Sequence, residues 1–211
     1  MTAPAWGLLA ATILVAIADW VAVARSIRIL EYIAKPAVMV GLIGVAVAMQ
    51  PENSTERVFF VIALSFGLAS DVLLMLPGDL FVWGLVTALI EHVTYISGFR
   101  TLSFNEGLFV VAAVIVLAST FLVFPTIYRA VRSAKHSLVA PVITYVAVLM
   151  VMVASAGGTG SGFAFAGALI FFYSDVLLAW NRFVGPIRGG RLANITFYHV
   201  GQALLVLSLM T

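Results

Sequence analysis

The chain has 211 residues, of which 63% are hydrophobic and 9% are charged. A soluble domain is about 45–50% apolar and about 25% charged, so this composition excludes a soluble globular protein and indicates an integral membrane protein. The absence of cysteine excludes disulfides, thiolate metal ligands and a cysteine nucleophile. The net charge of +2 is too small to indicate nucleic-acid binding, and no nucleic-acid partner is expected.

Eight apolar segments follow one another along the chain, with short connections between them. At about 20 residues per spanning helix, they predict an all-α polytopic membrane protein with eight transmembrane helices in a single domain, 1–211. No positively charged side chain precedes the first segment, so we expect it to be a retained helix and not a cleaved signal peptide. The segments lie at roughly 5–24, 36–50, 57–76, 80–98, 107–128, 137–156, 161–180 and 192–210.

Basic residues are distributed unevenly between the two sides of the predicted membrane domain. One side is formed by the termini and by the connections between the second and third, fourth and fifth, and sixth and seventh segments. This side contains only two basic residues, Arg57 and Arg100. Cytoplasmic connections carry the excess of Lys and Arg, so we expect both termini outside and the ends of the third and seventh segments toward the cytoplasm of a bacterial inner membrane. The opposite side holds Arg25, Arg28, Lys35, Arg129, Arg132, Lys135, Arg182, Arg188 and Arg191.

The sequence Ser-Asp-Val-Leu-Leu occurs twice, at 70–74 and at 174–178, with an offset of 104 residues. Two further pairs recur at nearly the same offset: Pro36 with Pro141, and His92 with His199. An even number of spans separates the two copies, so the halves share one orientation. We therefore predict two parallel four-helix repeats, about 1–104 and 105–211.

Each copy of this motif places one acid, Asp71 or Asp175, inside an apolar segment. A carboxylate at a helix centre costs about 2.5–3.5 kcal/mol to insert, so an intramembrane acid indicates a functional site by default. The structural alternative is a helix-end carboxylate that reaches the interface or bonds to a neighbouring helix. Two acids in one cavity of low polarity are expected to titrate apart, which would provide a general acid beside a general base.

Other polar side chains fall in the fourth and eighth segments. Such groups often bond between helices and hold a bundle together, so a cavity role and a structural role both stay open for them. Glu91 points about 100° away from His92 on the fourth helix and needs a partner of its own. The candidates for the cavity wall are His92, Tyr95, Tyr198 and Gln202.

Several polar residues near the ends of the segments complete the set of candidate binding residues. Ser70 and Ser174 precede the two acids, and Asn181 could bind a ligand or cap its helix. Lys35 stands at the predicted entrance of the second segment, where its side chain is expected to reach the interface and could meet a phosphate. Asp19 is a third buried acid, for which an ion pair with Lys35 or an arginine of the first inner connection and a site role are both open.

A long stretch of the second half resembles the lysoplasmalogenase family of YhhN-like membrane proteins. It runs Gly167-Ala-Leu-Ile-Phe-Phe-Tyr-Ser-Asp-Val-Leu-Leu-Ala-Trp-Asn-Arg-Phe183, followed by Tyr198-His-Val-Gly-Gln202. The resemblance extends over about 35 to 202. The first half contributes Lys35-Pro36, Ser70-Asp71-Val-Leu-Leu74, Gly84 and His92-Val-Thr-Tyr95. The chain departs from the family pattern at Ser70 and Ala88, where the family usually has Gly and often has Phe, and Glu91 is also unusual.

The resemblance implies an eight-helix enzyme that hydrolyses the vinyl-ether bond of lysoplasmalogens. It implies a lysophospholipid substrate, the products fatty aldehyde and glycerophosphoethanolamine or glycerophosphocholine, and Asp71 and Asp175 as catalytic acids. No metal and no organic cofactor is expected, and the oligomeric state is left open. Protonation of the alkenyl carbon by one aspartic acid, with the other carboxylate activating water, fits this reaction.

Four alternatives stay open at this point. An intramembrane aspartyl protease would use the same two acids, although the Gly-x-Gly-Asp expected there is absent. A zinc hydrolase would use His92, His136 or His199 together with the acids. A small-solute or lipid transporter would also suit parallel repeats and polar groups at the membrane midplane. The enzyme could also act on lipids other than plasmalogens.

Overall fold

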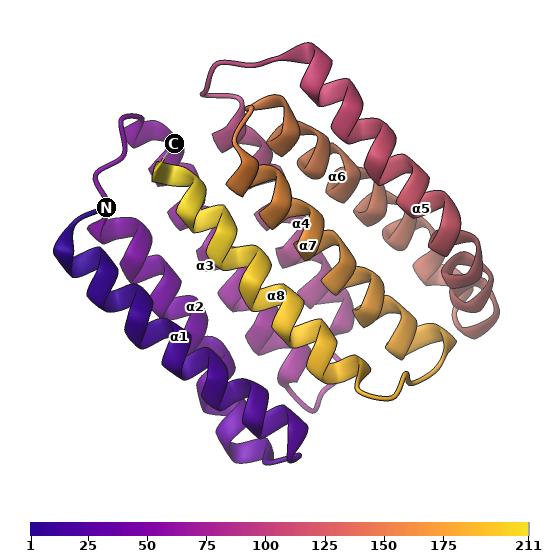
Figure 1. Cartoon of the computed structure of the whole chain (residues 1–211). Coiled ribbons are helices and arrows are strands. Elements are labelled where there is room, and N and C mark those ends of the chain that lie inside the picture. Colours follow the sequence, from indigo (N-terminus) through magenta and orange to yellow (C-terminus); the bar gives the residue numbers. More distant parts are fainter. Residues whose placement is uncertain (211) are drawn as a thin grey trace.

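In the computed structural model, which describes residues 1–210, the chain forms eight long helices, each long and apolar enough to cross a membrane (Figure 1). The predicted all-α fold with eight spanning helices is confirmed. Three short helical turns accompany them. The turn η1 (His136–Leu138) leads into α6, η2 (Trp180–Val184) continues α7, and η3 (Ser208–Met210) continues α8. The long helices are α1 (Ala3–Ala24), α2 (Arg28–Ala48), α3 (Ser54–Met75), α4 (Phe81–Phe99), α5 (Glu106–Ala134), α6 (Val139–Gly158), α7 (Gly162–Ala179) and α8 (Gly190–Leu207).

Two helix boundaries differ from the sequence prediction. The prediction started the second segment at 36, but α2 begins at Arg28 and continues through Pro36. Likewise, α5 continues through Pro125 to Ala134, beyond the predicted end near 128. A proline inside a helix removes one backbone hydrogen bond, and packing against neighbouring helices allows the helix to continue. Because α2 starts early, Lys35 lies two turns inside the helix and not at its entrance.

The helices pack as antiparallel neighbours along the chain: α1 with α2, α3 with α4, α5 with α6, and α7 with α8. Helix α2 also packs on α3, α6 packs on both α4 and α7, and α8 packs on α1 and α2. Figure 1 shows α8 in front, between the α1–α2 pair and α7, with α3 and α4 behind. This order brings the end of α3 and the end of α7 to the same region. The two parallel four-helix repeats stay a prediction.

The crossing of α7 and α8 is especially close. A Cβ added to Gly167 would lie 2.9 Å from the carbonyl oxygen of Gly201, and one added to Gly201 would lie 2.9 Å from the backbone nitrogen of Phe171. Small residues at a crossing let membrane helices approach backbone to backbone. The two glycines therefore hold the Ser-Asp segment of α7 against α8.

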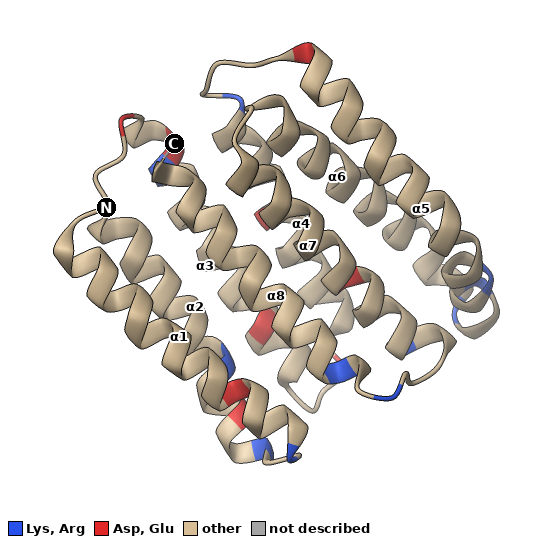
Figure 2. Cartoon of the chain, viewed as in Figure 1, with Lys and Arg blue, Asp and Glu red and all other residues tan. Residues whose placement is uncertain are grey.

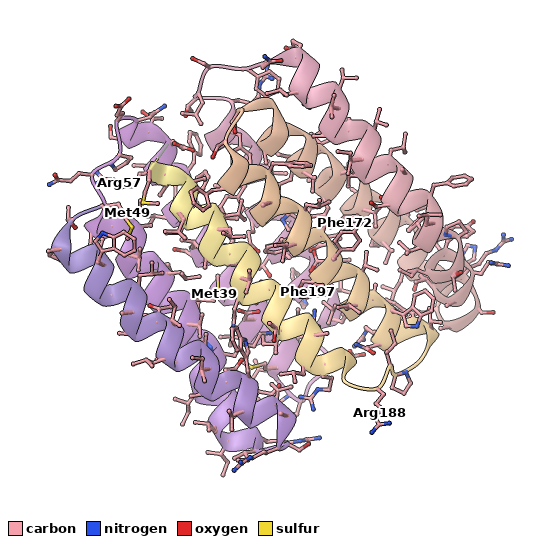
Figure 3. The ribbon with its side chains drawn as sticks, in the orientation of Figure 1. Met39, Met49, Arg57, Phe172, Arg188 and Phe197 are labelled. Carbon is pink, nitrogen blue, oxygen red and sulfur yellow. The ribbon has the colours of Figure 1, made fainter. Side chains whose placement is uncertain are left out.

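Most of the Lys and Arg residues are concentrated toward the helix ends. In Figure 2 most Lys and Arg positions lie at the lower and right-hand ends of the helices, where α1 meets α2, α5 meets α6 and α7 meets α8. Figure 3 shows Arg188 extending from the lower end of the bundle and Arg57 at the opposite end. The structure agrees with the division of charges on which the orientation was predicted. The orientation itself stays a prediction.

Candidate functional site

A cavity of about 440 Å³ lies toward the end of the bundle where the odd-numbered helices end and the even-numbered helices begin. Residues from all eight long helices and from η2 line it. Its wall is largely apolar, with a small number of polar groups, which is the usual character of a small-molecule site. Asp71 of α3 and Asp175 of α7 both line this cavity, so the structure brings the two motif acids to one space.

Asp71 forms a buried ion pair. The Lys35 ammonium lies 2.9 Å from Asp71 Oδ1, and only 16% of the lysine side chain and 5% of the aspartate side chain are exposed. The same ammonium lies 5.5 Å from the ring centre of Tyr198, whose hydroxyl contacts Met39 Sδ at 3.4 Å. Lys35 was expected to reach out to the interface, and this expectation is wrong, because Asp71 offers a compensating charge inside the bundle.

Asp175 has a different environment, made of a tyrosine hydroxyl and a histidine ring. The Tyr145 hydroxyl donates to Asp175 Oδ2 at 2.6 Å, and His92 Nε2 lies 2.8 Å from the same hydroxyl. A hydroxyl has one proton, so with Tyr145 donating to Asp175 it is His92 Nε2–H that donates to Tyr145. His92 Nδ1 is buried and has no hydrogen-bond partner within residues 1–210. The three side chains form a chain of hydrogen bonds that leads from the cavity into the bundle.

Tyr145 was missed by sequence reasoning, although it lines the cavity. It lies in α6, whose sequence is otherwise almost wholly apolar. The rule applied to the fourth and eighth segments, that a polar group deep in a span needs a partner, would have selected it.

Glu91 also lines the cavity and has found its own partners in α8. Gln202 Nε2 donates to Glu91 Oε1, and the Tyr95 hydroxyl donates to Gln202 Oε1 at 2.7 Å. A Cβ at Gly67 would collide with the Glu91 carboxylate, so this glycine of α3 makes room for it. Tyr95 and Gln202 are fully buried behind Glu91 and do not line the cavity, whereas Glu91 does.

The two serines and Asn181 are held mainly by the protein itself. Ser70 lines the cavity and donates to the carbonyl oxygen of Gly84 at 2.9 Å. Ser174 does not line it, and its hydroxyl accepts from Asn194 Nδ2 at 3.2 Å. Asn181 Oδ1 accepts from the backbone nitrogen of Ile187 at 3.0 Å and so fixes the turn after η2, while its side chain also borders the cavity.

Asp19 and His199 form a separate buried pair between α1 and α8. His199 Nε2 lies 3.9 Å from Asp19 Oδ2, and the Trp20 indole donates to His199 Nδ1 at 3.2 Å. The basic side chain within 4 Å of Asp19 is His199, and the ion pair with Lys35 or an arginine of the first inner connection, which was left open, is not formed. Neither residue lines the cavity.

The three histidines lie apart from one another. His92 contacts Tyr145, His199 contacts Trp20, and His136 is exposed at η1. Within residues 1–210, no three His, Asp or Glu side chains are grouped so that they could bind a metal ion. The donor arrangement of the described residues therefore gives no support to the zinc alternative.

The mouth of the cavity is charged. Arg28, Glu31 and Tyr32 of α2 line it together with Arg191 of α8. Arg191 Nη2 bonds to Glu31 Oε1 at 2.8 Å and to Oε2 at 2.9 Å. The Tyr32 hydroxyl donates to the carbonyl oxygen of Met75 at 3.0 Å, which ties α2 to the end of α3.

Comparison with known proteins places this geometry in a family context. Residues 30–209 match the YhhN family. The chain is similar to lysoplasmalogenase TMEM86B of Homo sapiens, at 30% identity over 146 residues, and to that of Mus musculus, at 28% over 147 residues. Each alignment covers 69% of this chain and 61% of the relative, so the chain spans about three fifths of the length of these curated relatives. No solved structure matches the chain.

Proposed function

This chain belongs to the YhhN family, and we propose that it is a membrane hydrolase that cleaves the vinyl-ether bond of a lysoplasmalogen. The products are a fatty aldehyde and glycerophosphoethanolamine or glycerophosphocholine. One observation carries the proposal: two aspartates in unlike environments line one largely apolar cavity. The names of the similar mammalian proteins support the same substrate class.

The cavity suits a lipid with a single hydrocarbon chain. Its inner wall contains large apolar side chains, among them Phe171, Phe172 and Leu149, and its mouth is charged. Figure 3 shows Phe172 in the interior of the bundle. Apolar groups would surround the alkenyl chain, and the charged mouth would keep the head group near the membrane surface, where water is available.

In the first step, Asp175 donates a proton to the alkenyl carbon that is not bonded to oxygen. Tyr145 already donates to Oδ2 of this residue, so Oδ1 is the oxygen that carries the proton. Protonation converts the vinyl ether into an oxocarbenium ion. Asp71 is an anion beside the Lys35 ammonium and stabilises the new positive charge across the cavity.

In the next steps, water adds to the oxocarbenium carbon while Asp71 accepts one of its protons, which gives a hemiacetal. Asp71 then returns this proton to the glycerol oxygen as the carbon–oxygen bond breaks, and Asp175 accepts the proton of the hemiacetal hydroxyl. The aldehyde and the glycerophosphoethanolamine or glycerophosphocholine leave, and both aspartates regain their first protonation states. One water molecule is consumed for each bond cleaved.

The test is aldehyde release from a 1-alkenyl lysophospholipid by the purified full chain, with the Asp71→Asn and Asp175→Asn variants beside it. General acid–base catalysis contributes about 10²–10⁴ in rate, so each variant is expected to lose at least about 100-fold. In D₂O the aldehyde should gain one deuterium on the carbon next to its carbonyl group. The saturated 1-alkyl lipid is the negative substrate, and Asp79→Asn, whose side chain does not line the cavity, is the control variant.

Absence of turnover by the wild-type protein would remove the substrate from the proposal. Full activity in both aspartate variants would remove the mechanism.

A further inference from the structure

The cavity mouth contains an ion pair that the proposed reaction does not use. Glu31 of α2 and Arg191 of α8 face each other there, and both line the cavity. The arginine side chain is 59% exposed and the glutamate side chain 19% exposed, so the pair is accessible from outside the bundle. The pair joins two helices that flank the entrance.

A second ion pair of the same type provides a contrast. Arg182 Nη2 lies 2.7 Å from Asp79 Oδ1, and neither residue lines the cavity. The hydrogen bond and the charge of Arg182 lower the pKa of Asp79 below its ordinary value. Of the two arginine–carboxylate pairs formed within residues 1–210, only the Glu31–Arg191 pair lines the cavity.

The two residues of the ion pair lie on the same helix faces as two residues near Asp71. Glu31 lies four residues before Lys35, one turn earlier on the same face of α2 and about 6 Å along the axis. Arg191 lies seven residues before Tyr198, two turns earlier on the same face of α8, about 10 Å along the axis. If the bond to be cleaved lies between the two aspartates, a head group that is joined to this bond by a short linker reaches the Glu31–Arg191 pair.

We propose that Glu31 and Arg191 form a subsite for a zwitterionic phosphate–ammonium head group. The proposal rests on the proposed function and names what determines its head-group specificity. The two side chains have the charges of such a head group in complementary form: Arg191 binds the phosphate and Glu31 binds the ammonium. On binding, the protein–protein ion pair is exchanged for two protein–ligand pairs.

The exchange is energetically feasible because the pair is partly exposed. Ion pairs that water reaches are weak, so opening this pair costs little. Arginine binds phosphate through two parallel hydrogen bonds, which are stronger than neutral ones. Arg28, also at the mouth, adds positive charge for the phosphate. A head group without an ammonium would leave the Glu31 carboxylate unpaired beside the phosphate, and this repulsion provides the selectivity.

The experiment measures binding of two saturated 1-alkyl lysophospholipids with the same chain, one with a phosphocholine head and one with a phosphoglycerol head. Neither has a vinyl ether, so binding is measured without turnover by the intrinsic tryptophan fluorescence of the purified full chain in neutral detergent. The wild type is expected to prefer phosphocholine by about tenfold, because the phosphoglycerol head has no cation to attract the Glu31 carboxylate. Glu31→Gln should abolish this preference, and Arg191→Gln should weaken binding of both lipids. Asp79→Asn should bind both as the wild type does.

The outcomes separate this proposal from the proposed function. A wild-type protein without head-group preference, or a Glu31→Gln variant that keeps the preference, overturns the subsite even if aldehyde release from alkenyl lipid is normal. Loss of the preference in Glu31→Gln supports the subsite even if the wild type releases no aldehyde. Thermal unfolding of each variant shows that it is folded. The double variant Glu31→Arg with Arg191→Glu exchanges the two charges, so it keeps the ion pair and reverses its direction.

Discussion

Asp71 and Asp175 occupy the same position in two copies of one five-residue motif, but their hydrogen-bonding and ion-pair partners differ in kind. Asp71 pairs with the Lys35 ammonium at 2.9 Å, whereas Asp175 accepts from the neutral Tyr145 hydroxyl at 2.6 Å. The motif itself cannot produce this difference, because neither partner lies near its acid in the sequence. The asymmetry supports the assignment of Asp175 as the proton donor and Asp71 as the carboxylate.

At Tyr145, removal of the hydroxyl breaks the hydrogen-bonded chain between Asp175 and His92. When Asp175 gives up its proton, the Tyr145 hydroxyl donates to the carboxylate that forms. A hydrogen bond to a charged group contributes about 1.5–3 kcal/mol, so Tyr145→Phe should reduce kcat about 10- to 100-fold. The matched control is Tyr173→Phe, since the Tyr173 hydroxyl contacts Ser119 on the exposed side of the bundle. Turnover of alkenyl lysophospholipid by the three proteins checks the expectation, and equal rates would contradict it.

At Lys35, a neutral replacement leaves the buried Asp71 carboxylate without its cation. Removing one partner of a buried ion pair destabilises by about 3–5 kcal/mol, so Lys35→Met should unfold at a markedly lower temperature than the wild type in detergent. The double variant Lys35→Met with Asp71→Asn should recover much of this loss, because no unpaired charge remains. Lys135→Met, at an exposed position, is the control. A double variant no more stable than the single one would argue against the ion pair.

At the scale of helices, the α7–α8 crossing depends on two positions without a side chain. An added methyl group at Gly167 would meet the backbone of α8 at 2.9 Å, and backbone atoms move only if the whole helix moves. Overpacking typically costs about 1–3 kcal/mol, so Gly167→Ala should lower the unfolding temperature and reduce activity through displacement of Asp175. Gly162→Ala, in the first turn of the same helix, adds its methyl to open space and should have little effect. Equal stability of the two variants would show that the crossing is looser than the structure indicates.

Helix lengths were predicted less well than helix number. Hydropathy identifies spans but not the polar turns that continue them, so the first two turns of α2 and the last turns of α5 were missed. The difference matters for the site, because the missed part of α2 contains Glu31 and Tyr32 at the cavity mouth. The η2 turn after α7 was also invisible in the sequence, although such π-type turns are often found at functional sites.

At the scale of the whole molecule, the charge distribution predicts that the cavity mouth faces the cytoplasm and that both termini lie outside. The chain contains no cysteine, so single cysteines can be introduced without background labelling. In intact bacterial cells, Glu52→Cys, between α2 and α3, should react with a membrane-impermeant thiol reagent, and Arg188→Cys, between α7 and α8, should react only after lysis. The opposite pattern would invert the orientation and leave the site geometry unchanged.

The sequence alone determined the membrane class, the eight helices and the two acids, because these depend on local composition and on the high cost of charge in an apolar segment. It also supplied Lys35, Ser70, Asn181 and Tyr198, which the structure places around one cavity with Asp71 and Asp175. Only the tertiary structure decided which residues meet. The pairing of Lys35 with Asp71, the chain from His92 through Tyr145 to Asp175, and the contact of Glu31 with Arg191 each join separate helices. Helix packing brings these groups together, and no periodicity within one segment encodes the partner in another.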